Sequence, residues 1–359
     1  MLFKKLFLFF IEKRKILNIE NLFSKKVDSI LVRPLGNAIG DAVVHTAHLQ
    51  QLRYLFPNAK LGVVVTPQNK EVFKHSGLVD TYVNRSIISY ILNFKKWDLL
   101  IDFENNFNSS SLFMDRIINP KYIAIFRKYN KKHYNFDTVK NYDFHFPQKE
   151  NERLSHYLIK SGLNRNNCLS ETYSKLTTNP INDEKVSRYW KKDKLKILLC
   201  PQGSKRQIPE NELAEFLNNS IPAPLLDKID IIVGYTNTAN EYTLRLRNLV
   251  PNIEINLSPK TTLSEYISLI SSADFVIAVD GGSLHIACAF QKPLLSFFAK
   301  SQPNMGTWEP LLAPTIPHLC VIINDDVGSN SNLTENFDLV PAIAWFNHYL
   351  KNKYNRDYK

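Results

Sequence analysis

The chain has 359 residues, of which 44% are hydrophobic and 22% charged. This balance is typical of globular proteins and excludes a disordered tail or a collagen-like repeat. At roughly 150 residues per domain, the length indicates two domains. The four cysteines form no CxxC pair, which argues against a disulfide scaffold or a zinc ribbon and favours a reducing compartment. No apolar run approaches the ~18 residues of a membrane span.

The charge balance indicates anionic partners. Forty-five Lys and Arg against 34 Asp and Glu give a net charge of +11. Such an excess favours nucleic acid, an anionic membrane surface or a phosphorylated substrate. The cations gather at both ends of the chain and between Arg127 and Lys132. No nucleic-acid-binding module accompanies them, so we expect no nucleic-acid partner.

Residues 1–26 interleave apolar and basic side chains. This pattern suits a helix in a membrane interface, with its lysines toward anionic headgroups. It equally suits a helix packed on the protein's own surface. A secretory signal is a third interpretation, but no small-residue cleavage site follows the short apolar run.

Strands and helices alternate from residue 27 onward. A helix over 41–56 follows the first strand, and Thr262 and Glu265 have capping-box spacing for a helix that runs through Ser272. Strands are predicted over 29–33, 60–65, 98–102, 122–126, 195–200, 229–234, 253–257, 275–279 and 294–298. This alternation predicts βαβ units on mainly parallel sheets.

A polar stretch from about Asn164 to Lys194 interrupts the alternation, and we interpret it as a linker. Two α/β halves of similar size imply a cleft between them, with ligands at the carboxyl ends of the strands. The predicted division is a basic amphipathic segment over 1–26, a first domain over 27–180, a second over 181–340 and a C-terminal helix over 341–359. Trp345 and Phe346 are expected to pack this helix back onto the first domain.

The strongest local signal follows the strand over 275–279. Asp280, Gly281, Gly282 and Ser283 join this strand to a helix. Glycines let a ligand approach the backbone closely because no Cβ blocks it. The free amides at the start of the helix can bind an anion such as a diphosphate. A tight turn capped by Asp280 explains the same pattern, so both interpretations stand.

A second loop with two glycines, Pro34 to Gly40, joins the first strand to its helix and places Asp41 at the helix N-terminus. The helix dipole favours an ionised carboxylate there. An ionised carboxylate that faces a cleft can act as a general base. An ordinary capping aspartate fits the same position.

The third candidate loop opens the second half of the chain, after the strand over 195–200. It holds Ser204, Lys205 and Arg206 ahead of a helix with Pro209 at its start. The two cations can neutralise phosphate charge. A solvated basic loop is the alternative.

The histidines indicate no metal site. His45 lies four residues after Asp41 and three before His48, and His285 lies one turn into the helix after Asp280. A structural role is the default for each. No HExxH, EF-hand, GxSxG or GxxxxGK[ST] pattern is present. We therefore expect neither a metal nor a cofactor, and neither a serine hydrolase nor a P-loop enzyme.

Together, the three loops resemble those of glycosyltransferase family 9, the ADP-heptose:lipopolysaccharide heptosyltransferases. That family carries Gly-Asp after the first strand, a Pro-Gly…Lys-Arg-Trp-Pro loop opening the second half, and Asp-(Thr/Ser)-Gly-x-x-His-x-Ala-Ala late in it. The corresponding segments are 39–46, 201–209 and 280–289, and the resemblance runs from about residue 29 to 345. Gly281 stands where Thr or Ser is usual, and Ile208 stands in place of the tryptophan.

The resemblance implies an α/β, GT-B fold: two Rossmann-like domains whose parallel sheets face a central cleft, with the acceptor in the first and the nucleotide sugar in the second. It implies an inverting, metal-independent transfer in which Asp41 takes a proton from the acceptor hydroxyl. Backbone amides and Lys205 or Arg206 would stabilise the departing diphosphate. The implied nucleotide-sugar contacts are Ser204, Lys205, Arg206, Glu241, Asp280, Gly281, Gly282, Ser283 and His285, with Glu241 as the acid on the ribose.

The expected reaction therefore moves heptose from ADP-heptose to the inner core of lipopolysaccharide or lipooligosaccharide in a Gram-negative bacterium. The acceptor is expected to be an anionic, lipid A–Kdo type saccharide. The expected location is cytoplasmic and peripheral on the inner face of the inner membrane, where the N-terminus and the Arg127–Lys132 cluster suit anionic partners. The alternatives are another nucleotide-sugar donor, a catalytically silent GT-B scaffold that binds glycolipid, and, with less support, a GT-B epimerase.

Overall fold

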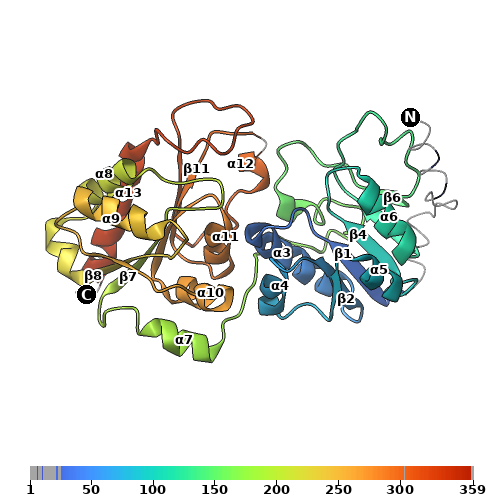
Figure 1. The fold of residues 1–359 in the computed structure, drawn as a ribbon, viewed down its shortest axis with the longest axis horizontal. Helices are drawn as coiled ribbons and strands as arrows, with labels where there is room; N and C mark the ends of the chain where they lie inside the picture. Colours follow the sequence, from blue (N-terminus) through green and yellow to red (C-terminus); the bar gives the residue numbers. More distant parts are fainter. Residues whose placement is uncertain (1–5, 7–9, 11–21, 23–25, 303, 357–359) are drawn as a thin grey trace. The chain divides into compact units, whose positions relative to one another are not determined.

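The computed structural model describes Leu6, Phe10 and Leu22, residues 26–302 and residues 304–356. Most of the predicted segment 1–26 lies outside these described residues. The chain divides into two compact units, Met1–Thr172 and Tyr173–Lys359 (Figure 1). The division falls before the predicted boundary at residue 180.

The first unit contains a parallel sheet with helices between its strands. Four of its strands (β1, β2, β4 and β5) have consecutive buried residues, because elements cover both faces of the sheet. The elements are β1 (Ser29–Arg33), α3 (Ile39–Leu55), β2 (Lys60–Val65), α4 (Lys70–Ser76), β3 (Thr81–Asn84), α5 (Ile87–Leu92), β4 (Leu99–Asp102), α6 (Ser109–Ile118), β5 (Tyr122–Ile125), β6 (Phe144–His145) and the 3-10 helix η1 (Leu154–His156).

The second unit repeats this architecture. Its elements are α7 (Pro180–Ser187), β7 (Leu195–Cys200), α8 (Glu210–Ser220), the 3-10 helix η2 (Ala223–Lys228), β8 (Ile229–Val233), α9 (Ala239–Leu249), β9 (Ile255–Leu257), α10 (Leu263–Ser272), β10 (Phe275–Val279), α11 (Gly282–Ala289), β11 (Leu294–Phe298), α12 (Asn304–Thr307), β12 (His318–Ile322) and α13 (Leu339–Arg356). The predicted capping box of α10 is confirmed: the Glu265 N–H donates to Thr262 Oγ1 at 3.2 Å, and the Thr262 N–H donates to Glu265 Oε2 at 2.8 Å.

The two sheets have the same strand order. Each has six strands within the described residues, in the orders β3-β2-β1-β4-β5-β6 and β12-β11-β10-β7-β8-β9, and every neighbouring pair is parallel. The winding direction reverses between β1 and β4 and between β7 and β10. In open parallel sheets, ligands bind at the carboxyl ends of the strands at such a switch point. The predicted fold class, α/β with two Rossmann-like parallel sheets, is confirmed, and all three candidate loops follow switch-point strands.

The last helix corrects one prediction. Phe346 is fully buried in the second unit's own core, with its ring centroid 5.4 Å from Phe216 and 4.8 Å from Phe275. The Trp345 ring lies 6.0 Å from Phe275. The expectation that these side chains pack on the first domain is wrong. Aromatic side chains of α8 and β10 form the surface that the apolar face of α13 covers.

Among the described residues, no helix combines the length and the apolar character needed to cross a lipid bilayer.

The packing of α13 makes a stability prediction. Phe346→Ala should destabilise the second unit by about 3–5 kcal/mol, because it removes a buried ring and leaves a cavity. Urea unfolding followed by intrinsic fluorescence measures this. Val340→Ala, on the same helix but 77% exposed, is the control and should change stability by about 0.5 kcal/mol or less. Equal effects of the two substitutions would contradict the described packing.

Candidate active site

The loop after β1 turns tightly against Asp41. Gly36 has a φ of +73°, and a Cβ on it would lie 1.9 Å from Asp41 Oδ2, so both backbone conformation and space require glycine there. The half-buried Asp41 carboxylate accepts a hydrogen bond from the Ala38 N–H at 3.0 Å. Asp41 therefore stabilises the start of α3 from the carboxyl edge of the first sheet. Its role as a base stays a prediction.

Two buried histidines connect this loop to a distant segment. The Leu35 N–H donates to His45 Nε2 at 2.8 Å, His45 Nδ1 and His48 Nδ1 lie 2.9 Å apart, and His48 Nε2 lies 2.9 Å from the Leu154 carbonyl. Because His45 Nε2 accepts, its proton is on Nδ1 and is donated to His48. The carbonyl then requires the His48 proton on Nε2. Only two neutral rings satisfy all three contacts.

The pKa values of both histidines agree with this assignment. Burial lowers the pKa of His45 well below its usual value, and the neighbouring His48 lowers it further. Burial also lowers the pKa of His48 to about 4. His48 stacks on Phe103 with ring centroids 4.3 Å apart. In the sequence, only the spacing of three residues indicates that His45 and His48 could be in contact. Their buried, neutral rings fit the predicted structural role.

A buried charge cluster lies at the first switch point, and sequence reasoning missed it. The Arg33 guanidinium binds both oxygens of Asp102, with Nε 2.8 Å from Oδ1, and its Nη1 lies 3.1 Å from Asp115. Lys128 Nζ lies 2.6 Å from Asp102. Burial acts to raise the pKa of Asp102, but the charges of Arg33 and Lys128 outweigh it and lower that pKa. The cluster joins the carboxyl ends of β1 and β4 to the residues after β5.

The Arg127–Lys132 segment is less available to partners than the sequence predicts. Lys128 belongs to the buried charge cluster. Arg127 donates to the Glu150 carbonyl at 2.6 Å and lies over the Tyr129 ring at 4.5 Å. Lys131 and Lys132 are exposed. Two of the four cations in this segment, Arg127 and Lys128, therefore already have partners within the first unit.

In the second unit, two candidate loops meet at the switch point. The loop after β7 forms a tight turn in which the Gly203 N–H donates to the Arg206 carbonyl at 2.8 Å. A Cβ on Gly203 would lie 3.4 Å from the Asp280 carbonyl oxygen, and one on Gly281 would lie 3.8 Å from the Gly203 Cα. Both distances are ordinary van der Waals contacts, so the two loop backbones lie side by side without requiring glycine at either position.

Arg206 links these loops to a third segment. Its Nη1 lies 3.2 Å from Asp280 Oδ2, while Nε donates to the Ser331 carbonyl at 2.5 Å and Nη2 donates to Ser331 Oγ at 2.7 Å. Asn304 Nδ2 also donates to Asp280 Oδ2, at 3.0 Å. Four contacts therefore fix the guanidinium and the carboxylate. Lys205, next to Arg206, is exposed and makes no ion pair with any described residue.

Tyr266 of α10 brings together the ends of three strands and was not predicted. Its hydroxyl lies 2.9 Å from Ser283 Oγ and donates to Cys200 Sγ at 3.3 Å. A Cβ on Gly234 would lie 2.9 Å from the same hydroxyl, so glycine after β8 leaves the space that Tyr266 fills. The signal available in the sequence is Gly234 at a strand end. No sequence pattern identifies Tyr266 of α10 as the residue that fills this space.

Two other predicted residues, Glu241 and His285, form no hydrogen bond with Asp280 or Arg206 among the described residues, although His285 lies near both. The Glu241 side chain, in the first turn of α9, is 80% exposed and lies 3.8 Å from Arg245 on the same helix. His285 is buried, and its ring centroid lies 6.0 Å from that of Trp308. Burial lowers the pKa of His285, whereas the nearby Asp280 raises it. Its neutral ring fits a packing role.

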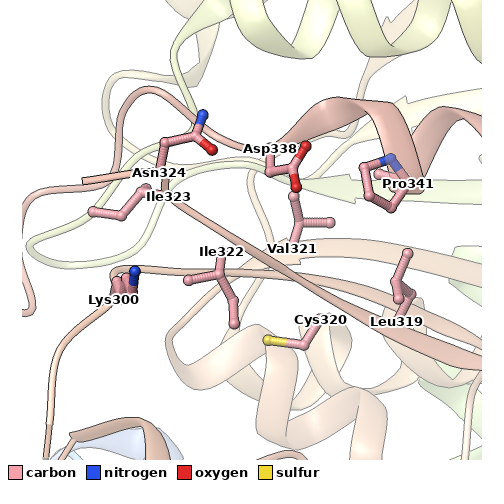
Figure 2. A pocket seen from close by; sticks show the side chains of 10 residues that line it. Lys300, Leu319, Cys320, Val321, Ile322, Ile323, Asn324, Asp338 and Pro341 are labelled. Atoms are coloured by element: carbon pink, nitrogen blue, oxygen red, sulfur yellow. The ribbon is translucent and has the colours of Figure 1, made fainter. Parts of the chain in front are cut away.

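A cavity of about 430 Å³ opens beside the loop after β7. Ser204, Lys205 and Arg206 line it together with Asn332 and Thr334. Figure 2 shows a different hollow, of about 350 Å³, beside the edge strand β12, where Lys300 and Asp338 lie among mostly apolar side chains. That hollow contains none of the predicted site residues. The first cavity is the one that combines cations with a switch-point loop.

Within the described part of the chain, no group of three or more His, Cys, Asp or Glu side chains is placed to hold a metal ion.

Solved structures share this fold over most of the chain. The Escherichia coli ADP-heptose lipopolysaccharide heptosyltransferase II matches with a TM-score of 0.67 and 16% identity, covering 90% of this chain and 98% of that one. A glycosyl transferase family 9 protein of Veillonella parvula matches with a TM-score of 0.67, 12% identity and the same coverage. The Escherichia coli heptosyltransferase WaaC with ADP gives a TM-score of 0.61 and 13% identity, with coverage of 89% and 99%.

These matches and the two switch-point sheets define the GT-B fold. The pattern of glycosyltransferase family 9 (heptosyltransferase) matches residues 90–316, more than half of the chain. The chain belongs to this family. A relative from Escherichia coli strain K12, named "Putative lipopolysaccharide heptosyltransferase 4", is 23% identical over 340 residues, which cover 84% of this chain and 87% of that protein.

The histidine pair predicts acid sensitivity. Both folded-state pKa values lie below the unfolded value of about 6.5, so the stability they contribute is complete above pH 6.5 and is lost as pH falls toward 4. Between pH 7.5 and 5, this loss should be about 2 kcal/mol for His48, and His45 should add to it in the same direction. Urea unfolding of wild type and of His45→Gln/His48→Gln measures it.

The double variant should lose less stability than wild type over this pH interval, although it is less stable at pH 7.5. His318→Gln, at an exposed position on β12, is the control and should follow wild type. Identical pH dependence in wild type and the double variant would argue against neutral buried histidines.

Proposed function

We propose that the protein transfers heptose from ADP-heptose to the inner core of lipopolysaccharide or lipooligosaccharide, with inversion and without a metal ion. Membership of the family supports glycosyl transfer. The names of the relatives support this donor and acceptor, and one WaaC structure contains ADP-2-deoxy-2-fluoro heptose. The observation that carries the proposal is the meeting of Arg206, Asp280 and two glycines at the second switch point.

The second unit is the proposed donor side. The backbone at Gly281 and Gly282 can approach a diphosphate without steric conflict, and the start of α11 presents N–H groups. Asp280 holds Arg206 in place. Lys205 is free to move toward the phosphates, so we assign it the direct contact and Arg206 the fixed positive field. Developing charge on the departing ADP is stabilised by both.

The first unit is the proposed acceptor side, with Asp41 as general base. As the acceptor hydroxyl oxygen attacks the anomeric carbon, its proton passes to the Asp41 carboxylate. The bond from that carbon to the diphosphate oxygen breaks, and ADP leaves with the electron pair. Attack opposite the leaving group inverts the anomeric configuration. The Ala38 N–H donates to Asp41 Oδ2 and holds the carboxylate at the start of α3.

The proposed acceptor is an anionic lipid A–Kdo type saccharide on the cytoplasmic face of a Gram-negative inner membrane. The net charge of +11 favours such a substrate and an anionic bilayer. The protein is proposed to bind the membrane peripherally.

A different nucleotide-sugar donor is the second candidate. Gly281 removes a hydroxyl that the family usually has, and Ile208 replaces a tryptophan. Competition between ADP-heptose and UDP-sugars in a transfer assay distinguishes the two donors. Mass spectrometry of core oligosaccharide from deletion cells should show the loss of one heptose if the first candidate holds.

Removing the proposed base should abolish turnover but not nucleotide binding. Asp41→Asn keeps an acceptor for the Ala38 N–H and should lower kcat about 10²–10⁴-fold, with the affinity for ADP unchanged by calorimetry. Glu71→Gln, in the first turn of α4, is the matched control and should retain activity. Treatment with a chelator should leave the wild-type rate unchanged. Normal turnover of Asp41→Asn would reject Asp41 as the base.

The two neighbouring cations should respond differently to substitution. Lys205→Ala removes a phosphate contact and should raise KM for the donor roughly tenfold without changing thermal stability. Arg206→Ala also breaks the contacts to Asp280 and Ser331 and should lower stability as well. Steady-state kinetics and thermal unfolding of both variants test this. If Lys205→Ala leaves KM unchanged, Lys205 does not bind the diphosphate.

A further inference from the structure

Helix α5 of the first unit carries its aliphatic side chains on the outside. Ile87, Ile88, Ile91 and Leu92 are each 56–74% exposed, and Phe94 just beyond the helix is 52% exposed. None of the helix's residues is buried. Single exposed apolar residues are ordinary, but five large ones within eight positions form a contiguous patch, which marks an interaction surface.

The orientation of α5 is fixed by its inner face. Ser86 accepts from the Ser89 N–H at 3.2 Å and caps the helix. Tyr90 packs against the core of the first unit. The indole N–H of buried Trp97 donates to Asn93 Oδ1 at 3.1 Å. Polar and aromatic groups therefore occupy the inner face, and the aliphatic groups cannot turn inward without displacing them.

The neighbouring helix also exposes an apolar side chain. Helix α6 packs beside α5 (Figure 1). On α6, Phe113 is 39% exposed, and the exposed Arg116 lies three residues further, on the same face. Both neighbouring helices of the first unit therefore expose apolar side chains, and α6 also exposes a cation.

Cations and no acids surround this patch in the sequence. Between Asp80 and Asp98 the chain has no Asp or Glu, and Lys95 and Lys96 are exposed, whereas Arg85 Nη2 lies 3.9 Å from Glu104 Oε1. Lys95 Nζ lies 5.2 Å from the Phe94 ring centroid, so an ammonium group borders the apolar surface directly. Apolar side chains bordered by cations match an anionic lipid bilayer, where the acyl boundary takes the former and the phosphates take the latter.

We propose that α5, with Phe94 and Phe113, is the membrane-docking surface of this protein. The aliphatic side chains enter the boundary between headgroups and acyl chains, and Lys95, Lys96 and Arg116 bind anionic headgroups. The inference rests on the peripheral membrane location in the proposed function, and it assigns that contact to a folded surface of the first unit.

Vesicle binding by the full-length protein tests this surface. Ile88→Ser/Ile91→Ser should reduce partitioning onto phosphatidylcholine–phosphatidylglycerol vesicles roughly tenfold in a sedimentation assay. Lys95→Glu/Lys96→Glu should do the same, and wild type should bind pure phosphatidylcholine weakly. The control is Ile181→Ser/Val340→Ser, two positions of the second unit that are 77% exposed, and it should bind like wild type.

Two results would overturn the proposal. Wild-type vesicle binding by both α5 variants would assign the membrane contact elsewhere. Concentration-dependent self-association that the isoleucine variant abolishes, without any vesicle binding, would identify a second copy of the chain as the occupant.

Transfer assays test the proposed reaction separately from vesicle binding. Transfer to a soluble, deacylated acceptor should be unchanged in both α5 variants, whereas transfer to acceptor embedded in vesicles should fall. A wild-type protein that binds vesicles through α5 but transfers no heptose to either acceptor would reject the proposed reaction and keep the docking surface.

Discussion

The contact between Arg206 and Asp280 is the interaction on which the proposed donor site depends. It joins the loops after two adjacent strands whose connections run in opposite directions along the sheet. Further hydrogen bonds hold both partners in place: Ser331 accepts from the Arg206 guanidinium, and Asn304 donates to the Asp280 carboxylate. A Cβ at Gly203 or Gly281 would make ordinary van der Waals contacts, so the polar contacts of Arg206 and Asp280, rather than the glycines, hold the two loops together.

The first unit contains an equivalent pair. Arg33 ends β1 and Asp102 ends β4, as neighbours in register across the first switch point. Here the pair is fully buried and joined by Lys128 and Asp115, whereas Arg206 is partly exposed beside a cavity. An Arg–Asp pair therefore lies at the switch point of each sheet, buried in the first unit and partly exposed in the second. The buried ion network holds the ends of β1 and β4 in a fixed arrangement.

Much of this organisation could be predicted from the sequence, because buried parallel strands are continuous apolar runs. β1, β7, β10 and β11 were predicted with their observed bounds, and so were the loops that follow the first three. β3, β6 and β12 were not, since edge strands are short or half-exposed and lack that signal. The contacts of Tyr266 and Lys128 could not be predicted, because their partners lie on elements far away in the sequence. The packing of α13 could not be predicted, because the sequence does not show which unit presents an aromatic surface to it.

The route of the chain has a consequence for how this protein can change. Each unit is formed from one continuous stretch of sequence, and the backbone passes from the first to the second a single time. Helix α13 packs in the core of its own unit, and each residue of that core cluster comes from the second unit's own stretch of sequence. Substitutions that remodel what one half recognises need not disturb the interior of its neighbour. The binding residues of one unit can therefore change during evolution without changing the core of the other unit.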